Sequence, residues 1–168
     1  MTLLVASKLT AAAFKPYGAV IAPETARRRQ VINSGTTVRF DEACAVDVDG
    51  GAVLSIFRGQ PFQPPHLIAM LERHPRGSQA FVPLDAAAPY LVVAARAGDD
   101  GAPLAPECFY VDDGSGVQYA RNVWHHPLLA LGTGPSDFLV VDRASDAEGP
   151  NLEETVIPER RLAFPPPH

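Results

Sequence analysis

The sequence predicts an all-β protein, and three observations support this fold class. Turn-forming residues are frequent, with dense clusters at residues 49–51, 98–101 and 112–116. Short apolar or alternating segments of strand length lie between these turns. Signals for helices are few. Many short strands at close spacing favour a β-barrel or a sandwich, and a small barrel holds one ligand at its mouth.

The expected strands are short and rich in β-branched and aromatic residues, which suit a pleated sheet. In chain order they cover residues 36–41, 43–48, 52–58, 67–74, 79–84, 90–95, 107–111 and 138–142.

One or two short helical segments are expected beside the strands. Thr10 is a good helix cap for residues 11–14, and Pro16 and Gly18 would end that helix. Residues 158–161 could form one terminal turn, and the Pro-rich tail at 165–168 is expected to fray. No break in composition marks a linker, so residues 1–164 are expected to form a single domain.

Composition and charge exclude several classes of protein. The chain of 168 residues is 46% hydrophobic with a net charge of −5, which is unlike a disordered chain or a nucleic-acid-binding protein. The basic triplet at residues 27–29 is interpreted as a solvated turn. No apolar run is long enough to cross a membrane, and Cys44 and Cys108 are too few for a disulfide framework. We therefore expect a cytoplasmic protein with reduced thiols.

The first stretch with chemical character contains Glu72, His74 and Gln79. Side chains alternate along a strand, so Glu72 and His74 point the same way. If the strand after the turn at Pro75 and Gly77 pairs back, Gln79 lies beside His74. A carboxylate, an imidazole and an amide would then meet on one face. The alternative is that Glu72 and His74 face solvent at a sheet edge.

The second stretch, residues 118–127, contains the single Trp of the chain and two of its five His. His125 and His126 are adjacent, so in a strand one of them must face away from the other. The alternative to a functional role is that Trp124 anchors the core while one His is exposed.

Together the two stretches follow the spacing of the cupin metal motif. Glu72-x-His74-x(4)-Gln79 occupies its first part, and Ala120-x-Asn122-x-x-His125 occupies its second. The spacing is kept while residue types differ, because Glu and Gln replace two ligands and the Pro and Gly of the second part are missing. Glu72, His74, Gln79 and His125 still offer an oxygen and nitrogen set for a divalent metal.

The chain resembles the ureidoglycolate lyase family over residues 3–164. The matching blocks are residues 14–21, 32–35, 71–75 (Leu-Glu-Arg-His-Pro), 79–83, Tyr119, 121–128 (Arg-Asn-Val-Trp-His-His-Pro-Leu), 137–139 and 142–143. The resemblance implies a cupin-type β-barrel, a homodimer, and cleavage of (S)-ureidoglycolate to glyoxylate and urea. It also suggests a divalent metal such as nickel, and no organic cofactor is expected. The alternatives are a cupin-type isomerase or hydrolase of another small hydroxy acid, and a barrel that binds a small ligand without catalysis.

That reaction needs a base for the hydroxyl proton, an acid for the departing nitrogen and a group that holds the carboxylate. The catalytic candidates are His74, Glu72, His125 and Gln79. The candidates for substrate binding are Arg58, Tyr119, Asn33, Ser55 and Arg73, of which Arg58 is preferred to Arg73 because Arg73 and His74 have opposite strand parity. Each Arg could instead pair with a surface carboxylate, and Tyr119 could be a barrel residue. Asp142 and Arg143 are expected to serve structure or a subunit contact.

Overall fold

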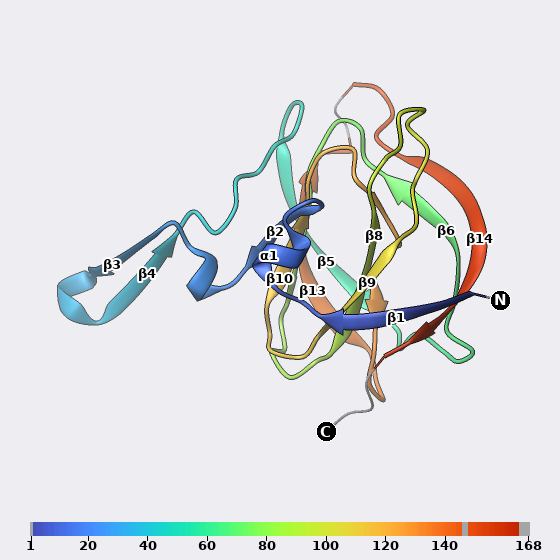
Figure 1. Ribbon diagram of the computed structural model, residues 1–168. Helices are drawn as coiled ribbons and strands as arrows, with labels where there is room; N and C mark the ends of the chain where they lie inside the picture. Colours follow the sequence, from blue (N-terminus) through green and yellow to red (C-terminus); the bar gives the residue numbers. More distant parts are fainter. Residues whose placement is uncertain (1, 146–147, 165–168) are drawn as a thin grey trace.

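The structure is a computed structural model that describes residues 2–145 and 148–164. Figure 1 shows two curved β-sheets that face each other, with one short helix at their side and a hairpin that projects away from them. The strands are β1 (Thr2–Lys8), β2 (Gly18–Ile21), β3 (Arg28–Ile32), β4 (Thr37–Asp41), β5 (Ala52–Gly59), β6 (Leu67–Arg73), β7 (Gln79–Pro83), β8 (Tyr90–Ala95), β9 (Glu107–Val111), β10 (Gly116–Tyr119), β11 (Trp124–His125), β12 (Leu129–Ala130), β13 (Ser136–Arg143) and β14 (Glu153–Ala163).

The larger sheet has the strand order β11-β6-β14-β1-β9-β8-β12. Strand β11 also pairs with β8, so this sheet closes on itself through a strand of two residues. Strand β1 runs parallel to both its neighbours, β14 and β9, whereas the other pairs in the sheet are antiparallel. The smaller sheet has the order β2-β10-β7-β13-β5, and β2 and β5 are its edge strands.

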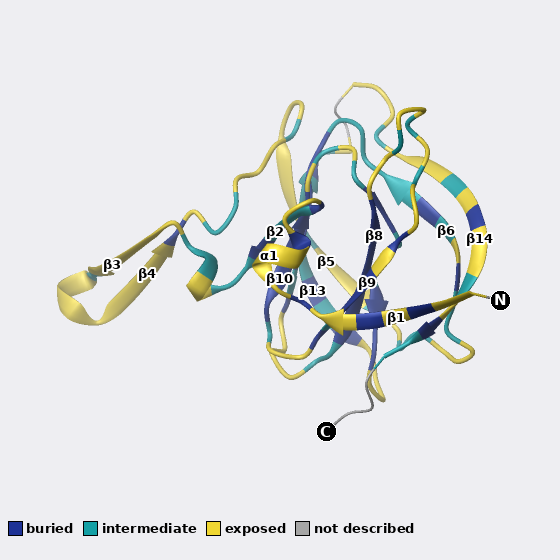
Figure 2. Cartoon of the chain, viewed as in Figure 1, coloured by how far each residue is buried: buried dark blue, intermediate teal, exposed yellow. Residues whose placement is uncertain are grey.

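The protein has two hydrophobic cores, one between the sheets and one inside the larger sheet, and strand β8 contributes to both. Alternate side chains of β8 face opposite ways, and all six of its residues are buried. Tyr90, Val92 and Ala94 contribute to the core that lies between the two sheets. Leu91, Val93 and Ala95 contribute to the core inside the larger sheet. The closure of the larger sheet therefore produces a strand with no solvent face (Figure 2).

The predicted helix is present as α1 (Ala11–Phe14), with Thr10 as its cap. The Thr10 hydroxyl accepts a hydrogen bond from the Ala13 amide at 3.1 Å. The helix buries Phe14 between Tyr17 and Phe109. Two short 3-10 helices, η1 (Pro23–Thr25) and η2 (Asn33–Gly35), follow later in the chain. The prediction of an all-β barrel with one or two short helices is confirmed.

The hairpin of β3 and β4 stands apart from the barrel. We call residues 28–41 the arm, which comprises β3, η2 and β4. It extends to the left of the smaller sheet in Figure 1, and none of its residues belongs to either core. The basic triplet at residues 27–29 was interpreted as a solvated turn, but its last two residues belong to β3. Arg27 and Arg28 both form ion pairs with Glu42.

Two of the expected elements are wrong. Residues 43–48 were expected to form a strand, but they cross the smaller sheet as an extended segment with a single bridge at Val48. We call residues 43–49 the strap. Hydrogen bonds to Ser78 and Gln118 hold it, so its polar groups are satisfied outside a ladder. Residues 158–161, expected to form a turn, lie within β14, where pairing with β1 and β6 overrides the local signal.

The remaining predictions on organisation are only partly addressed. No helix among the described residues is long and apolar enough to span a membrane. The single domain over residues 1–164 stays a prediction, and the tail at 165–168 lies outside the described residues. Cys108 is buried as expected, whereas Cys44 is half-buried; both thiols are free.

Candidate functional site

Glu72, His74 and His125 form a compact group, which we call the Glu/His cluster. Glu72 lies near the end of β6, and His74 follows that strand directly. His125 lies on β11, where its backbone pairs opposite Glu72. Each of the three residues offers one ligand atom, and these atoms all lie within 4.8 Å of one another. The predicted convergence of the two motifs is thus produced by the pairing of β6 with β11.

The two imidazoles of the cluster have defined tautomers. Nδ1 of His74 lies 2.7 Å from the Asn151 carbonyl oxygen, and Nδ1 of His125 lies 2.9 Å from that of Val123. Because a carbonyl oxygen only accepts, each Nδ1 must carry the proton. Each neutral ring therefore presents an unprotonated Nε2 to the cluster.

The cluster contains an excess of hydrogen-bond acceptors. Nε2 of His74 and of His125 lie 3.8 and 3.6 Å from the same oxygen, Oε1 of Glu72. Both Nε2 atoms are buried and have no hydrogen-bond partner among the described residues. Buried acceptors without a donor are costly, so the arrangement calls for a proton or a cation between them.

Electrostatics keep the Glu72 carboxylate ionised. Burial raises its pKa, but interaction with the imidazoles of His125, His74 and His126, when these carry a proton, lowers the pKa by more. The net pKa of Glu72 is therefore below its ordinary value of 4.5. A negative charge held among imidazoles suits either the binding of a cation or the stabilisation of an imidazolium.

Gln79 adds a fourth acceptor beside the cluster. Its Nε2 donates to Oδ2 of Asp142 at 3.4 Å, whereas its Oε1 is buried and has no partner among the described residues. A carboxylate accepts but does not donate, so Asp142 selects the orientation of the amide. Asp142 was expected to serve structure or a subunit contact, and its carboxylate contacts a predicted site residue.

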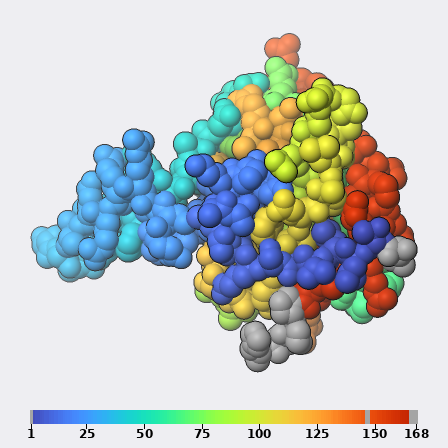
Figure 3. Space-filling model, viewed as in Figure 1, coloured from blue at the N-terminus to red at the C-terminus, as the bar shows by residue number. Residues whose placement is uncertain are grey.

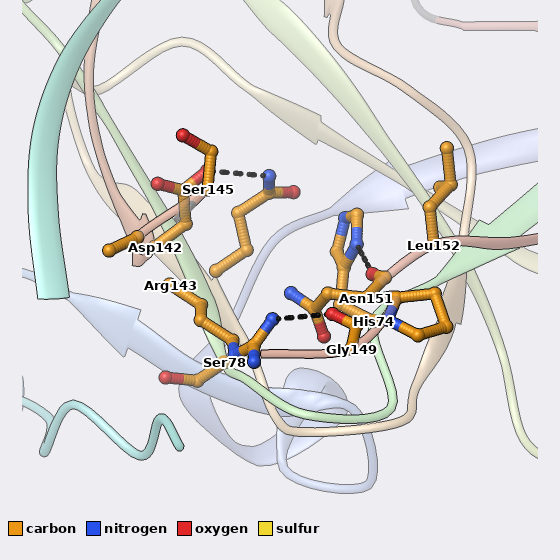
Figure 4. A pocket seen from close by; sticks show the side chains of 11 residues that line it. His74, Ser78, Asp142, Arg143, Ser145, Gly149, Asn151 and Leu152 are labelled. Carbon is orange, nitrogen blue, oxygen red and sulfur yellow. Dashed lines mark hydrogen bonds between the residues drawn. The ribbon is translucent and has the colours of Figure 1, made fainter. Parts of the chain in front are cut away.

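Two cavities adjoin this group. One, of about 300 Å³, is lined by His74, Ser78, Gln79, Asp142, Arg143 and Asn151, among others (Figure 4). The other, of about 340 Å³, is lined by Glu72, Gln79, Phe57, Phe81 and Leu128, among others. Gln79 lines both, so the site residues can be approached from either side of this amide. The cavity of about 340 Å³ is bordered by β5, an edge strand of the smaller sheet.

Tyr119 closes the cluster toward the core. Its ring stacks on His125 with centroids 4.0 Å apart and an interplanar angle of 14°. Tyr119 also packs with Phe14 and Phe81 in the core between the sheets. Burial raises the pKa of Tyr119 well above its ordinary value, so its hydroxyl stays protonated. Tyr119 therefore orients the His125 ring from the core side.

The other candidates for substrate binding lie outside the cluster. Arg58 forms a bidentate pair with Asp137 on the outside of the smaller sheet, with distances of 2.7 and 2.8 Å. Arg73 lies over the Trp124 ring and pairs with Glu153. Asn33 is in the arm, and Ser55 lies on β5 opposite Val140. The structure thus brings together Glu72, His74, Gln79, His125 and Tyr119. Arg58 lines the cavity of about 340 Å³ together with Glu72 and Gln79, whereas Arg73, Asn33 and Ser55 line neither of the two cavities.

Sequence reasoning missed the residues that orient the site. The Asn151 carbonyl fixes the His74 tautomer, and the side-chain oxygen of Asn151 accepts from the Arg76 amide at 2.8 Å. Arg143 holds the same region, donating to the carbonyls of Asp49, Glu148 and Gly149. The one available signal was the Asp142-Arg143 pair. Which backbone carbonyl will accept a hydrogen bond from a site residue cannot be read from residue types.

Comparisons with known proteins identify the family of this chain. The family model described as "Ureidoglycolate lyase" matches residues 1–163. The chain belongs to the ureidoglycolate lyase family. A ureidoglycolate lyase of Burkholderia mallei (strain NCTC 10229) is 51% identical over 163 residues, covering 95% of this chain and 92% of that protein. A ureidoglycolate lyase of Brucella anthropi is 49% identical over 154 residues, covering 90% and 88%.

Among solved structures, a 3,4-ketoisomerase from Helicobacter canadensis matches with a TM-score of 0.40 and 14% identity, covering 73% of this chain and 80% of that one. This likeness is weak, and the barrel is defined by its own strand topology. Membership of the ureidoglycolate lyase family depends on the family model and on the relatives at about half identity.

Proposed function

We propose that this chain is a ureidoglycolate lyase that cleaves (S)-ureidoglycolate to glyoxylate and urea. The observation that carries the proposal is the Glu/His cluster, which lies beside a cavity large enough for a small hydroxy acid, in a chain about half identical to ureidoglycolate lyases. The reaction breaks the bond between the carbinol carbon and the urea nitrogen. Its hydroxyl loses a proton and becomes the aldehyde oxygen of glyoxylate, and the departing nitrogen gains a proton.

His74 is the group best placed to accept the hydroxyl proton. Its Nε2 carries no proton, and its side chain lines the cavity of about 300 Å³. The hydrogen bond from Nδ1 to Asn151 persists as the ring becomes charged, and the Glu72 carboxylate 3.8 Å away stabilises that charge. The same proton can then be delivered to the departing nitrogen. Gln79 presents an acceptor oxygen that can hold the substrate hydroxyl or the urea N–H.

The same atoms also fit a divalent metal. Nε2 of His74, Nε2 of His125 and Oε1 of Glu72 converge, and the unpartnered Oε1 of Gln79 is the fourth acceptor that we assign to the set. A bound divalent cation would supply positive charge for the substrate carboxylate and would lower the pKa of its hydroxyl. Nickel is the proposed metal on the family resemblance. The lone pair on Nε2 of His74 can therefore either accept a proton or bind a metal, and the experiment below distinguishes these two roles.

The deciding experiment measures release of urea and glyoxylate from (S)-ureidoglycolate. The protein is stripped of metal and assayed alone, with nickel and with manganese, against a blank without enzyme. We expect turnover above the blank, and a loss of at least about 100-fold in kcat/KM for His74→Ala. Activity that needs added metal assigns the cluster to metal binding. Activity that survives stripping assigns His74 to proton transfer.

The matched control is His66→Ala. His66 packs between the rings of Phe62 and Phe164, at 5.4 and 5.0 Å, on another part of the barrel. It should retain the activity of the unmodified chain. Absence of turnover under every metal condition would overturn the proposal, and so would equal losses in the two histidine variants.

We also propose that the protein works in the cytoplasm. Support comes from the two cysteines, both of which are free thiols. Disulfides are rare in that reducing compartment. Fractionation of the source cells, with immunodetection of the chain, tests this location.

A further inference from the structure

The cavity of about 300 Å³ beside His74 lies where two distant segments of the chain meet. One is the turn after β6, residues 74–77, and the other is residues 148–151. The Arg76 amide donates to the side-chain oxygen of Asn151 at 2.8 Å, and the Arg76 guanidinium donates to the Glu148 carbonyl at 2.5 Å. Figure 3 shows the two segments, green and red, together at the upper end of the molecule. Direct hydrogen bonds therefore fix this side of the cavity.

Asn151 has donors left over after these contacts. Its backbone carbonyl accepts from Nδ1 of His74, and its Oδ1 accepts from the Arg76 amide. Because an amide N–H only donates, the second bond orients the Asn151 side chain with its oxygen toward Arg76. Figure 4 shows no hydrogen bond from Nδ2 of Asn151 to the other residues that line the cavity. The two N–H groups on Nδ2 are therefore available to a molecule in the cavity.

Arg143 adds a positive charge to the same side of the cavity. It is 8% exposed and donates to three backbone carbonyls, and it forms no ion pair with a carboxylate among the described residues. A Cβ built on Gly77 would lie 3.1 Å from Cβ of Arg143 and 3.7 Å from Nδ2 of Asn151, so the two side chains flank the same position. A buried charge without a partner of opposite charge is unfavourable, so this pair of side chains favours a bound anion.

Hydrogen-bond acceptors gather on another side of the cavity. The Gln79 oxygen is buried without a partner among the described residues, and the Asp142 carboxylate holds the Gln79 N–H group. Figure 4 shows Asp142 and Asn151 on different sides of the cavity. Ureidoglycolate is divided in the same way, because its central carbon carries a carboxylate that only accepts and a urea nitrogen that donates. The hydroxyl on that carbon faces Nε2 of His74 in the proposed reaction.

We propose that Nδ2 of Asn151 and the Arg143 guanidinium form a carboxylate subsite for the substrate. This assignment rests on the proposed lyase function and adds the group that holds the carboxylate. The urea N–H then lies on the Gln79 oxygen and the hydroxyl on His74. Three of the five guanidinium N–H groups of Arg143 bind backbone carbonyls, which leaves two for the carboxylate. Arg58, expected for this role from the sequence, instead pairs with a carboxylate on β13.

The test compares two ligands that differ only in the carboxylate, namely glycolate and its uncharged amide, glycolamide. Titration calorimetry on the purified full chain measures the Kd of each. Hydrogen bonds to a charged group are the stronger ones, so glycolate should bind at least about tenfold more tightly than glycolamide.

Asn151→Asp keeps the acceptor for the Arg76 amide and the backbone carbonyl for His74, but an oxygen replaces Nδ2. The Kd of glycolate should rise at least about tenfold, because this oxygen donates nothing and repels the carboxylate. The Kd of glycolamide should change less than about threefold, because that ligand carries no charge. Unchanged binding of glycolate in Asn151→Asp would contradict the proposal.

Leu152→Asp is the matched control. It adds the same charge at the next residue, which is 52% exposed, and leaves the Asn151 amide in place. The Kd of glycolate should rise less than about threefold, since solvent and salt screen an exposed charge. Equal weakening in Leu152→Asp and Asn151→Asp would show repulsion at a distance instead of contact and would overturn the proposal. Equal affinity of the unmodified chain for the two ligands would overturn it as well.

Folding and turnover are tested separately. A thermal melt identifies loss of folding in Asn151→Asp. In that case Asn151→Ala, which removes the donors without adding charge, must weaken glycolate binding at least about threefold for the proposal to stand. A chain that releases urea but binds glycolate equally well without Nδ2 of Asn151 is a lyase without this subsite. A chain without turnover that still selects glycolate through Asn151 has the subsite but not the proposed lyase activity.

Discussion

Asp142 shows how a single residue can define the chemistry of a neighbour. Its carboxylate accepts the Gln79 amide N–H, which leaves the buried amide oxygen without a partner among the described residues. In Asp142→Asn the replacement side chain also donates, so either orientation of Gln79 becomes acceptable. We expect a loss of about 10-fold in kcat or in metal affinity, which is typical of a lost outer hydrogen-bond partner.

Steady-state kinetics and calorimetric titration with nickel measure these two quantities for Asp142→Asn. A thermal melt serves as the control, because the substitution preserves shape and should leave stability nearly unchanged. Unaltered kcat together with unaltered metal affinity would show that Asp142 does not position Gln79.

Individual site residues were predictable where strand parity and motif spacing determine position. Glu72, His74, Gln79 and His125 were all identified in this way, because a two-residue period and one cross-strand pair bring them together. Arg58 illustrates the limit of the same reasoning. It lines the cavity that also contains Glu72 and Gln79, but its parity differs from that of the inward-facing Phe57 and its guanidinium pairs with Asp137. Which face of a strand points inward depends on tertiary packing, which a local pattern does not contain.

At the scale of elements, the start of β2 depends on Gly18. Its φ is +152°, and an added Cβ would contact the Gln118 carbonyl oxygen of the neighbouring strand β10. Because that oxygen belongs to the sheet, it cannot move aside cheaply. Gly18→Ala should therefore lower the free energy of unfolding by about 2 kcal/mol or more, as measured by chemical denaturation.

Gly51→Ala is the matched control for this prediction. An added Cβ at Gly51 would meet only the Ala144 Cβ at 3.8 Å, an ordinary contact. The free energy of unfolding should change by less than about 0.5 kcal/mol. Similar losses in the two variants would contradict the assigned role of Gly18.

The strap is held by charge as well as by backbone hydrogen bonds. Arg121 donates to Asp47 at 3.1 and 2.7 Å and to Asp49 at 2.8 Å. These hydrogen bonds lower the pKa of Asp47 and of Asp49 below their ordinary value of 3.8, although desolvation acts the other way. The stabilisation is therefore complete above that ordinary value and is lost as pH falls through the lowered values.

Removing the charge tests this role of Arg121 at neutral pH. In Arg121→Gln the Asp47 and Asp49 amides should exchange hydrogen faster. The global free energy of unfolding should change little, because these ion pairs are exposed. Hydrogen exchange detected by mass spectrometry measures the local effect. Unchanged exchange across the strap would show that the backbone bonds alone hold it.

The elements themselves were predictable to different degrees. Strands such as β8 carry an apolar run bounded by turn residues, and they were identified. The strap has a similar local pattern, but it makes a single bridge at Val48 instead of pairing as a strand. Residues 158–161 were expected to form a turn, but they belong to β14. In both cases distant partners decide the outcome, and no local window contains them.

At the scale of the whole molecule, a metal in the Glu/His cluster should stabilise the fold. The ligands come from β6, from the residue that follows it and from β11, so a bound ion would tie these segments together. A ligand present at 100 times its Kd adds about 2.7 kcal/mol to the free energy of unfolding. Nickel should therefore raise the Tm in differential scanning calorimetry.

Acidification should reduce this rise in Tm, because protons compete with the metal for the imidazole nitrogens. Glu72→Gln removes the one negative charge of the cluster and should abolish most of the rise. A nickel-induced rise of the same size in Glu72→Gln would place the metal elsewhere.

The pairing of β14 with both β1 and β6 bears on how the protein is made. During synthesis, Glu72, His74, Gln79 and His125 all leave the ribosome before β14 does. Until residues 153–163 emerge, β6 lacks its long antiparallel neighbour and β1 lacks one of its two partners. Nδ1 of His74 also lacks its hydrogen-bond acceptor until Asn151 has been synthesised. A nascent chain that stops short of β14 thus contains every residue of the cluster without the strand that orients them, and catalytic competence should arise only after residues 153–163 have emerged.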